Sequence, residues 1–215
     1  MDLETIKLLT DGATLDGVDC LSASVEMGNG NACEVETGIF LYALARRYKP
    51  KLVVHTGTHM GYDVSWIALG LKENGINYPH MAGYVVTADM ADYEQRKTWD
   101  RLSLYNIISL VGDSRVPETW GNVLHPIQWV HLDADHSEES IWLEYQALLP
   151  HMDKQKCILS THDSRLDVRV GPGFNAVIRD LEKRRAEGNG WKHIGHFPLR
   201  NLRGIDFLML SNEDI

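Results

Sequence analysis

The sequence of residues 52–71 is LVVHTGTHMGYDVSWIALGL, and it predicts a strand, a turn and a helix in immediate succession. Its first three residues form a continuous apolar run, which is typical of a strand that is covered on both faces. Gly57 and Gly61 lie in the turn, where glycine lets the backbone approach a ligand closely at the end of a doubly wound sheet. A tight turn that binds nothing would have the same pattern.

Similar apolar runs recur along the chain, with helical patterns between them. Further strands are predicted at residues 84–86, 107–111, 127–132 and 157–159, and the clearest helices at 137–149 and 173–187. We expect Ser137 to cap the first of these helices and Pro150 to end it. Strands that alternate with helices form a parallel sheet through right-handed crossovers.

The last part of the chain departs from this alternation. Two strand-like runs, at 191–197 and 205–210, are joined by a loop too short to hold a helix, so they must pair antiparallel. The sequence therefore predicts an α/β fold: a single doubly wound, Rossmann-like domain whose mostly parallel seven-stranded sheet ends in an antiparallel hairpin. We assign residues 35–215 to this domain, and residues 1–34, rich in Gly, Asn and Asp, to a cap or lid.

Composition narrows the classes of function. A formal net charge of −9 over 215 residues disfavours nucleic acid as a partner, because binding to phosphates depends on clustered Lys and Arg. No apolar run approaches the roughly 18 residues of a membrane helix, and the acidic N-terminal residues Asp2 and Glu4 differ from the basic start of a signal peptide. We therefore expect a cytoplasmic protein with a small-molecule partner and no membrane association.

The glycine turn is followed by candidate contacts to a nucleotide-like cofactor. Asp89 ends the second strand, where folds of this class place a carboxylate on ribose hydroxyls, although an aspartate there is as often a helix cap. Asp113 and Ser114 follow the third strand, where they would either meet an adenine or serve the turn. The candidate cofactor-binding residues are His55, Gly57, Thr58, His59, Gly61, Asp63, Asp89, Asp113 and Ser114.

Polar residues end two further strands, at Asp133 and at the pair His162 and Asp163. Adjacent strands lie about 4.8 Å apart, so these three side chains can converge as ligands of a divalent metal, with Mg²⁺ or Mn²⁺ as candidates. Successive strand residues point to opposite faces, so His162 and Asp163 can both be ligands only if the chain bends there. His136 is the candidate general base. Solvated strand ends without a metal are the alternative.

Two motifs resemble a known family. The segment PKLVVHTGTHMGY, residues 50–62, resembles the first motif of class I methyltransferases, and VHLDADHS, residues 130–137, followed by His162 and Asp163, is similar to a pattern of the small-molecule methyltransferases of family 24. The resemblance covers about residues 35–211 and implies S-adenosylmethionine as cofactor. Metal-dependent relatives that methylate sugar or catechol hydroxyls imply Asp133 and Asp163 as metal ligands and His136 as the base.

The first motif departs from the family pattern at three places. His55 replaces the usual Glu, His59 stands where Gly is frequent, and Asp63-Val64 replace Ser-Thr. In the family, that Glu organises the loop and the methionyl amine, so its loss implies weaker cofactor binding or a pocket with another use.

Two hypotheses follow. The first is an S-adenosylmethionine-dependent methyltransferase, with His136 and Asp133 as catalytic residues, that methylates a small-molecule or sugar hydroxyl with metal assistance. The alternative is a non-catalytic binding module of methyltransferase fold with an altered cofactor motif. A nicotinamide oxidoreductase is disfavoured because G-x-G-x-x-G is absent from the sequence. The tryptophans Trp66, Trp99 and Trp142 belong in a core or at an interface, which leaves a homodimer open.

Overall fold

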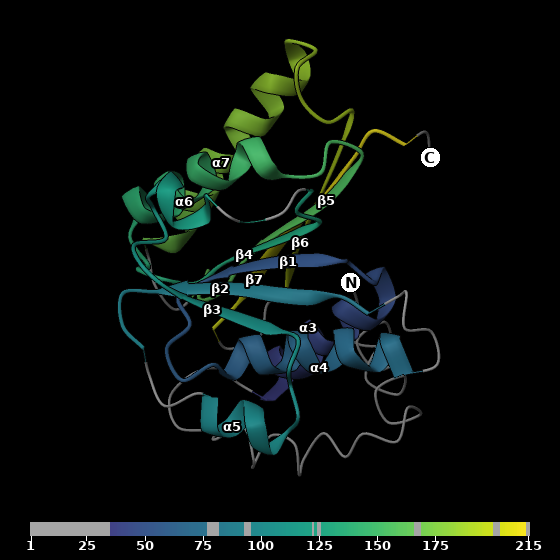
Figure 1. Cartoon of the computed structure of the whole chain (residues 1–215). Coiled ribbons are helices and arrows are strands. Elements are labelled where there is room, and N and C mark those ends of the chain that lie inside the picture. The colour runs from purple at the N-terminus through teal and green to yellow at the C-terminus, as the bar shows by residue number, and fades with distance from the viewer. Residues whose placement is uncertain are drawn as a thin grey trace.

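A seven-stranded sheet forms the centre of the molecule, with the strand order β3-β2-β1-β4-β5-β7-β6 (Figure 1). The computed structural model describes residues 35–76, 82–92, 96–121, 123, 126–165, 169–199 and 203–213, so the predicted cap at 1–34 lies outside the described residues. The strands are β1 (Leu52–Thr56), β2 (Tyr84–Asp89), β3 (Ile107–Val111), β4 (Trp129–Leu132), β5 (Lys156–Thr161), β6 (His193–Leu199) and β7 (Ile205–Ser211).

The direction of the strands confirms the predicted fold class. The first five strands pair in parallel, and β7 pairs antiparallel with both β5 and β6. Strand order reverses between β1 and β4, because β2 and β3 lie on one side of β1 while β4 and β5 lie on the other. Doubly wound folds bind ligands at such a switch point, outside the carboxyl ends of the strands.

Helices cover both faces of the sheet (Figure 1). The helices are α3 (Val35–Tyr48), α4 (Tyr62–Ile76), α5 (Arg96–Arg101), α6 (Glu138–Leu148) and α7 (Val170–Ala186), with short 3₁₀ turns η2 (Pro117–Trp120) and η3 (Leu149–His151). Alternate strand residues divide between two cores. Val53 and Trp129 pack in the core with α3 and α4, whereas Val54 and Val130 pack in the core with α6 and α7.

Local sequence signals predicted the boundaries of α6 well. Ser137 caps the helix by accepting a hydrogen bond of 3.1 Å from the backbone N–H of Ser140. The α-helix ends at Leu148, and Pro150 lies in the 3₁₀ turn that follows. The predicted span of 137–149 is therefore confirmed, since a proline cannot continue the α-helical hydrogen bonds.

Three strands differ from the prediction, and one of them is β4, which begins at Trp129 and not at the predicted Ile127. β3 was expected to be covered on both faces, but it forms the edge of the sheet, and its side chains Ile108 and Val111 are 49% and 64% exposed. An apolar run therefore does not distinguish an edge strand from a central one. β6 begins at His193 and not at the predicted Trp191, whose ring is buried in the core beside α6 and α7.

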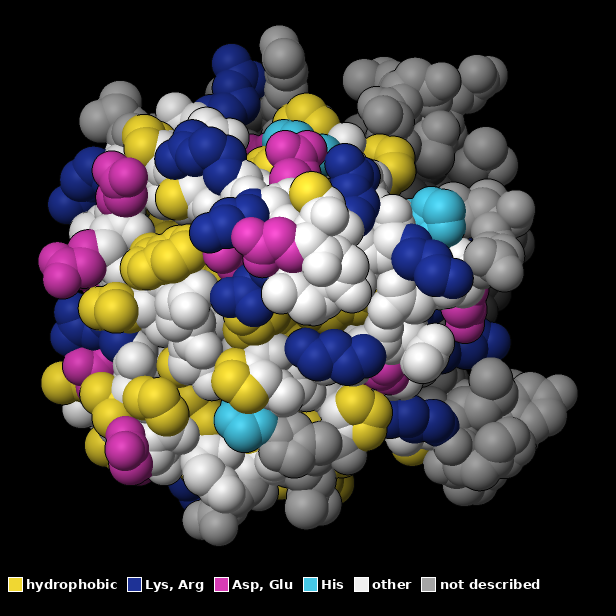
Figure 2. All heavy atoms as spheres, turned by 90° about the horizontal axis from the view of Figure 1, so that it is seen from above, with side chains coloured by type: hydrophobic (Ala, Val, Ile, Leu, Met, Phe, Trp, Pro, Cys, Tyr) yellow, Lys and Arg dark blue, Asp and Glu magenta, His cyan; other side chains and the backbone are white. Residues whose placement is uncertain are grey.

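The face formed by α6 and α7 carries charges of both signs, mixed with small apolar areas (Figure 2). Along α7, Arg184 pairs with Asp180 at 2.6 Å and Lys183 with Glu187 at 3.9 Å. None of the helices in the described ranges has the length and apolar character needed to cross a membrane.

Candidate functional site

A cavity of about 680 Å³ lies at the carboxyl ends of the parallel strands, where the switch point of the sheet predicts a ligand site. Every residue that the sequence predicts for the site lines this cavity: His55, Gly57, Thr58, His59, Gly61, Asp63, Asp89, Asp113, Ser114, Asp133, His136, His162 and Asp163. Side chains from five strand ends are thus brought to one place, as their positions after apolar runs indicated.

The glycine turn between β1 and α4 is built so that only glycine fits at its first position. Gly57 has a φ of +76°, and its backbone N–H donates a hydrogen bond of 2.9 Å to the carbonyl of Ala88. A Cβ atom at Gly57 would collide with the carbonyl oxygen of Asp133 and lie 2.5 Å from the Cα of Ala134. The turn therefore lies directly against the loop after β4, which brings two predicted motifs into contact.

Asp89 at the end of β2 closes the other side of the turn. Its carboxylate accepts a hydrogen bond of 2.8 Å from the backbone N–H of His59, which itself has a φ of +41°. Both carboxylate oxygens of Asp113, at the end of β3, accept hydrogen bonds from the guanidinium of Arg115, at 2.8 and 2.7 Å. Arg115 holds the pKa of Asp113 below its usual range through these bonds.

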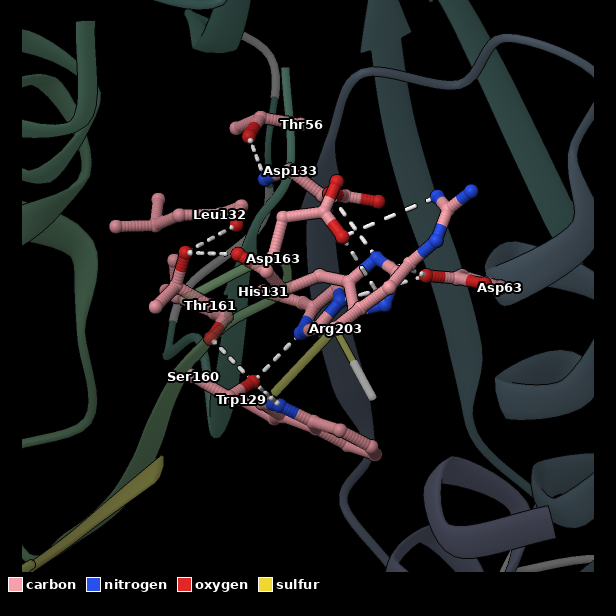
Figure 3. Close-up of polar contacts among 12 residues, drawn as sticks. Thr56, Asp63, Trp129, His131, Leu132, Asp133, Ser160, Thr161, Asp163 and Arg203 are labelled. Carbon is pink, nitrogen blue, oxygen red and sulfur yellow. Dashed lines mark hydrogen bonds and ion pairs between the residues drawn. The ribbon is translucent and has the colours of Figure 1, made fainter. Parts of the chain in front are cut away.

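Glu144 of α6 is a buried carboxyl that the sequence prediction missed. It connects two strand ends directly and a third one through Thr56. It accepts hydrogen bonds from Ser114 Oγ at 2.5 Å and from Thr56 Oγ1 at 3.1 Å. Thr56 Oγ1 in turn accepts a bond of 2.9 Å from the backbone N–H of Asp133 (Figure 3). Burial raises the pKa of Glu144 to about 7, against the lowering effect of the two hydroxyl donors.

Asp133, His136 and Asp163 form a cluster at one wall of the cavity. One ligand atom of each lies within 4.8 Å of the others. His136 Nε2 lies 3.3 Å from Asp133 Oδ1, and His136 Nδ1 lies 3.4 Å from Asp163 Oδ2. The two carboxylates suit a divalent cation such as Mn²⁺, and the imidazole of His136 lies between them. We call these three residues the upper cluster.

His162 lies beneath the upper cluster and is 1% exposed. Its Nδ1 atom is 3.6 Å from Asp133 Oδ1, and its Nε2 atom is 3.7 Å from Asp163 Oδ1. The chain bends at Asp163, whose φ is +56°. The ligand atom that comes together with those of Asp133 and Asp163 nevertheless belongs to His136, and the predicted ligand His162 is not part of this group. Burial alone would lower the pKa of His162, but the carboxylates of Asp133 and its neighbours raise it to about 10.

The neighbouring histidines also change the pKa values of the carboxyl groups of Asp133 and Asp163. Burial would raise the pKa of Asp133, but His162 and His136 outweigh this effect and lower it far below the usual range. Asp163 shows the opposite balance, because burial raises its pKa and the lowering by His162 is smaller. Asp133 is thus the carboxylate that stays ionised, and the positive charge opposite it is carried by His162.

A second group of polar side chains lies at the floor of the cavity, between β1, β4 and α4. His55 of β1 is adjacent to His131 of β4 in the sheet, and the two rings have centroids 5.1 Å apart. Asp63 in the first turn of α4 reaches over both strands, with Oδ2 3.8 Å from His131 Nε2 (Figure 3). We call His55, Asp63 and His131 the floor cluster.

Comparison with known proteins places the chain in a family. A family described as "Methyltransferase domain", Methyltransf_24, matches residues 54–164, which is slightly more than half of the chain. The chain belongs to this family. The predicted relationship to class I methyltransferases is therefore confirmed, and the matched segment runs from β1 through the glycine turn to the upper cluster.

Solved methyltransferase structures share the fold over nearly the whole chain. A methyltransferase from Geobacter sulfurreducens is 20% identical, with a TM-score of 0.60 and coverage of 93% of this chain and 94% of that chain. The O-methyltransferase TomG from Streptomyces achromogenes, solved in complex with SAM, is 16% identical, with a TM-score of 0.67 and 90% coverage of each chain. An O-methyltransferase from Bacillus cereus, in complex with SAH, is 15% identical, with a TM-score of 0.63, 98% coverage of this chain and 92% of that chain.

A search of curated proteins found no match. The methyltransferase assignment thus depends on the family match, and the structural likeness extends the fold beyond the matched residues.

Some lining residues of this methyltransferase cavity had no clear signal in the sequence. Arg115 and Arg203 both line the cavity, and Arg203 Nη1 lies 3.9 Å from Asp163 Oδ1. Glu144 did have a signal, because it occupies an apolar position of α6, between Ile141 and Leu148 on the buried stripe. A carboxyl in such a stripe must find hydrogen-bond partners, so it indicates a structural or functional role.

Proposed function

We propose that this methyltransferase binds S-adenosylmethionine in the 680 Å³ cavity and methylates a hydroxyl group of a small molecule or sugar with help from a divalent cation. The observation that carries the proposal is the position of the upper cluster, which faces the same cavity as the glycine turn. A proton acceptor and two carboxylates are therefore held beside the place where a nucleotide-like cofactor fits.

The residues around the glycine turn fit the cofactor. Gly57 has no Cβ atom, so a ligand can approach the backbone of the turn closely. Asp89 presents a carboxylate at the end of β2, where it would accept hydrogen bonds from the hydroxyls of a ribose. His55, Thr58, His59, Gly61 and Asp63 would line the methionine side, and Asp113 and Ser114 the adenine side. When bound, the cofactor supplies an electrophilic methyl group on its sulfonium sulfur. The O-methyltransferases TomG and that of Bacillus cereus, with the same fold, were solved with SAM and SAH.

The upper cluster fits an acceptor hydroxyl. In the proposal, His136 takes the proton that the hydroxyl loses as its oxygen attacks the methyl carbon. Asp133, His162 and Asp163 would hold the divalent cation, which would lower the pKa of the hydroxyl and orient it. Because Asp163 lies at a bend of the chain, its carboxylate is aimed at His136, at 3.4 Å.

Titration calorimetry tests the cofactor part of the proposal. The full chain is titrated with S-adenosylmethionine and with S-adenosylhomocysteine, with and without Mn²⁺. We expect saturable binding of both compounds, and transfer of labelled methyl groups to a catechol or a sugar only when Mn²⁺ or Mg²⁺ is present. The absence of any heat at millimolar cofactor would instead support the non-catalytic binding module, in which His55 in place of Glu has abolished cofactor binding.

A further inference from the structure

Several buried polar atoms of the floor cluster lack a hydrogen bond within the part of the chain that the structure describes. His55 is 1% exposed, His131 0% and Asp63 5%. Both ring nitrogens of His55, both carboxylate oxygens of Asp63 and the Nε2 atom of His131 lack a hydrogen bond. Each such atom costs about 1–3 kcal/mol when it is buried without a partner, and native structures contain few of them. Five in one place therefore indicate a ligand.

The donor atoms of the floor cluster lie close to one another and to the carboxylate of Asp133. His55 Nδ1 or Nε2, Asp63, His131 and Asp133 each offer one atom, and all four atoms lie within 4.8 Å of one another. Two imidazoles and two carboxylates form the mixed nitrogen and oxygen set that first-row transition metals prefer, whereas Mg²⁺ and Ca²⁺ prefer oxygen ligands alone. The two carboxylates also balance the charge of a divalent ion.

The residue behind His131 fixes the ring in the orientation that a metal ligand needs. Ser160 Oγ accepts a hydrogen bond of 2.8 Å from Trp129 Nε1 and lies 2.7 Å from His131 Nδ1 (Figure 3). When the hydroxyl donates its own proton to the carbonyl of Val130, at 3.4 Å, it accepts one from Nδ1. His131 Nε2 then carries a lone pair directed at the cluster, which is the outer-shell arrangement typical of metal-bound histidine.

The geometry points to a buried binding site for one divalent transition-metal ion, such as Zn²⁺ or Mn²⁺, held by His55, Asp63, His131 and Asp133. This floor site differs from the upper cluster, with which it shares only Asp133. Without an ion, the ring of His162 offsets the two carboxylates, since its Nδ1 atom lies 3.8 Å from Asp63 and 3.6 Å from Asp133. The inference does not depend on methyl transfer, because the site consists of the chain's own donors.

Zinc binding to the metal-free full chain tests the site, with thermal unfolding as the second measurement. His55→Leu removes two partnerless nitrogens and breaks no hydrogen bond to the protein, so the metal-free variant should unfold at a higher temperature than the wild type. Its affinity for Zn²⁺ should fall by more than about a hundredfold, since losing an outer-shell partner alone costs 10- to 100-fold. The increase in melting temperature with Zn²⁺ should fall in parallel.

A matched variant of the upper cluster separates the two sites. His136→Gln removes a donor of the upper cluster only, so it should keep the tight Zn²⁺ binding and the four-coordinate visible spectrum of the Co²⁺ form. Asp63→Asn replaces His55→Leu if the latter does not fold. The floor site would be overturned if His55→Leu or Asp63→Asn bound Zn²⁺ as tightly as the wild type. It would also be overturned if His136→Gln lost Zn²⁺ binding. Because His55 and Asp63 also line the proposed cofactor pocket, cofactor binding of each variant is measured separately by calorimetry with S-adenosylmethionine.

Discussion

The hydroxyl of Ser114, after β3, donates a hydrogen bond of 2.5 Å to the carboxyl of Glu144 in α6. Glu144 is 1% exposed and also accepts a bond from Thr56 at the end of β1. One buried acid thus joins two strand ends that flank the cavity. Since Thr56 also holds the backbone of Asp133, Glu144 acts as a positioning residue for the wall of the site.

Replacing Glu144 by Gln should flatten the dependence of stability on pH. The pKa of Glu144 is raised from 4.5 to about 7 in the folded chain, so between these pH values the folded chain keeps a proton that the unfolded chain has lost. Stability therefore falls as pH rises from 4.5 to 7, by about 3 kcal/mol at 1.36 kcal/mol per pH unit. Urea unfolding at pH 5 and pH 7.5 should show a correspondingly smaller difference in Glu144→Gln.

The control for this experiment is Glu182→Gln, because Glu182 is exposed on α7. It should leave the difference between the two pH values unchanged. An equal pH dependence in Glu144→Gln and the wild type would contradict a raised pKa for Glu144.

Gly57→Ala should destabilise the chain and abolish cofactor binding. A Cβ atom there meets the carbonyl of Asp133, and alanine is strained at a φ of +76°. Gly188 offers a matched control, with a φ of +75° and no atom within 4 Å of an added Cβ. Gly188→Ala should cost only the backbone strain of about 1–3 kcal/mol, and Gly57→Ala more. Equal losses in chemical denaturation would mean that the contact with Asp133 is not restrictive.

Asp89→Asn should weaken binding of S-adenosylhomocysteine by about tenfold or more, which corresponds to about 1.4 kcal/mol. The amide still accepts the bond from His59, but it lacks the charge that strengthens hydrogen bonds from ribose hydroxyls. Calorimetry gives the affinity, and Asp100→Asn, at an exposed position of α5, is the control. If both variants bind equally well, Asp89 does not contact the ribose.

Asp133→Ala should abolish metal-dependent turnover and leave cofactor binding largely intact, because its carboxylate belongs to both metal clusters and lies beyond the glycine turn. Asp100→Ala is the control, since Asp100 is exposed on α5. Initial rates at several Mn²⁺ concentrations measure the effect. If Asp133→Ala turned over at the wild-type rate, Asp133 would not be a ligand of the metal used in catalysis.

His136→Ala should slow methyl transfer by about 10²- to 10⁴-fold without loss of the fold, as expected for removal of a general base. His136 contacts Asp133 at 3.3 Å and Asp163 at 3.4 Å, so the variant also shows whether these carboxylates can act alone. Single-turnover rates measure the effect. A rate equal to that of the wild type would exclude His136 as the base.

Much of the fold could be predicted because its signals are local. The apolar runs, the glycine turn after β1 and the cap at Ser137 each depend on a few neighbouring residues, and the structure has them where the sequence placed them. The hairpin of β6 and β7 followed from a loop too short for a helix. The edge position of β3 and the helix α3 were not foreseen, since neither follows from an apolar pattern alone.

The sequence predicted which residues line the site, but not which of them contact one another. Residues that follow strands must lie at one edge of a parallel sheet, so their convergence followed from topology. Which of them touch depends on register and bends, such as the φ of +56° at Asp163 that brings it to His136. The pairing of His131 with His55 across β1 and β4 could not be predicted from one strand alone.

The register of β4 restricts where residues can be inserted or deleted in this sequence. Val130 packs with α6 and α7, while its neighbour His131 lies on the opposite face, beside His55 and Ser160 in the adjoining strands. Deleting a single residue early in β4 would exchange these two faces. The imidazole would then lie in the apolar core with α6 and α7, and the valine would lie beside His55 and Ser160. Insertions and deletions in its descendants should accordingly be confined to the loops, and the strands should vary only by substitution.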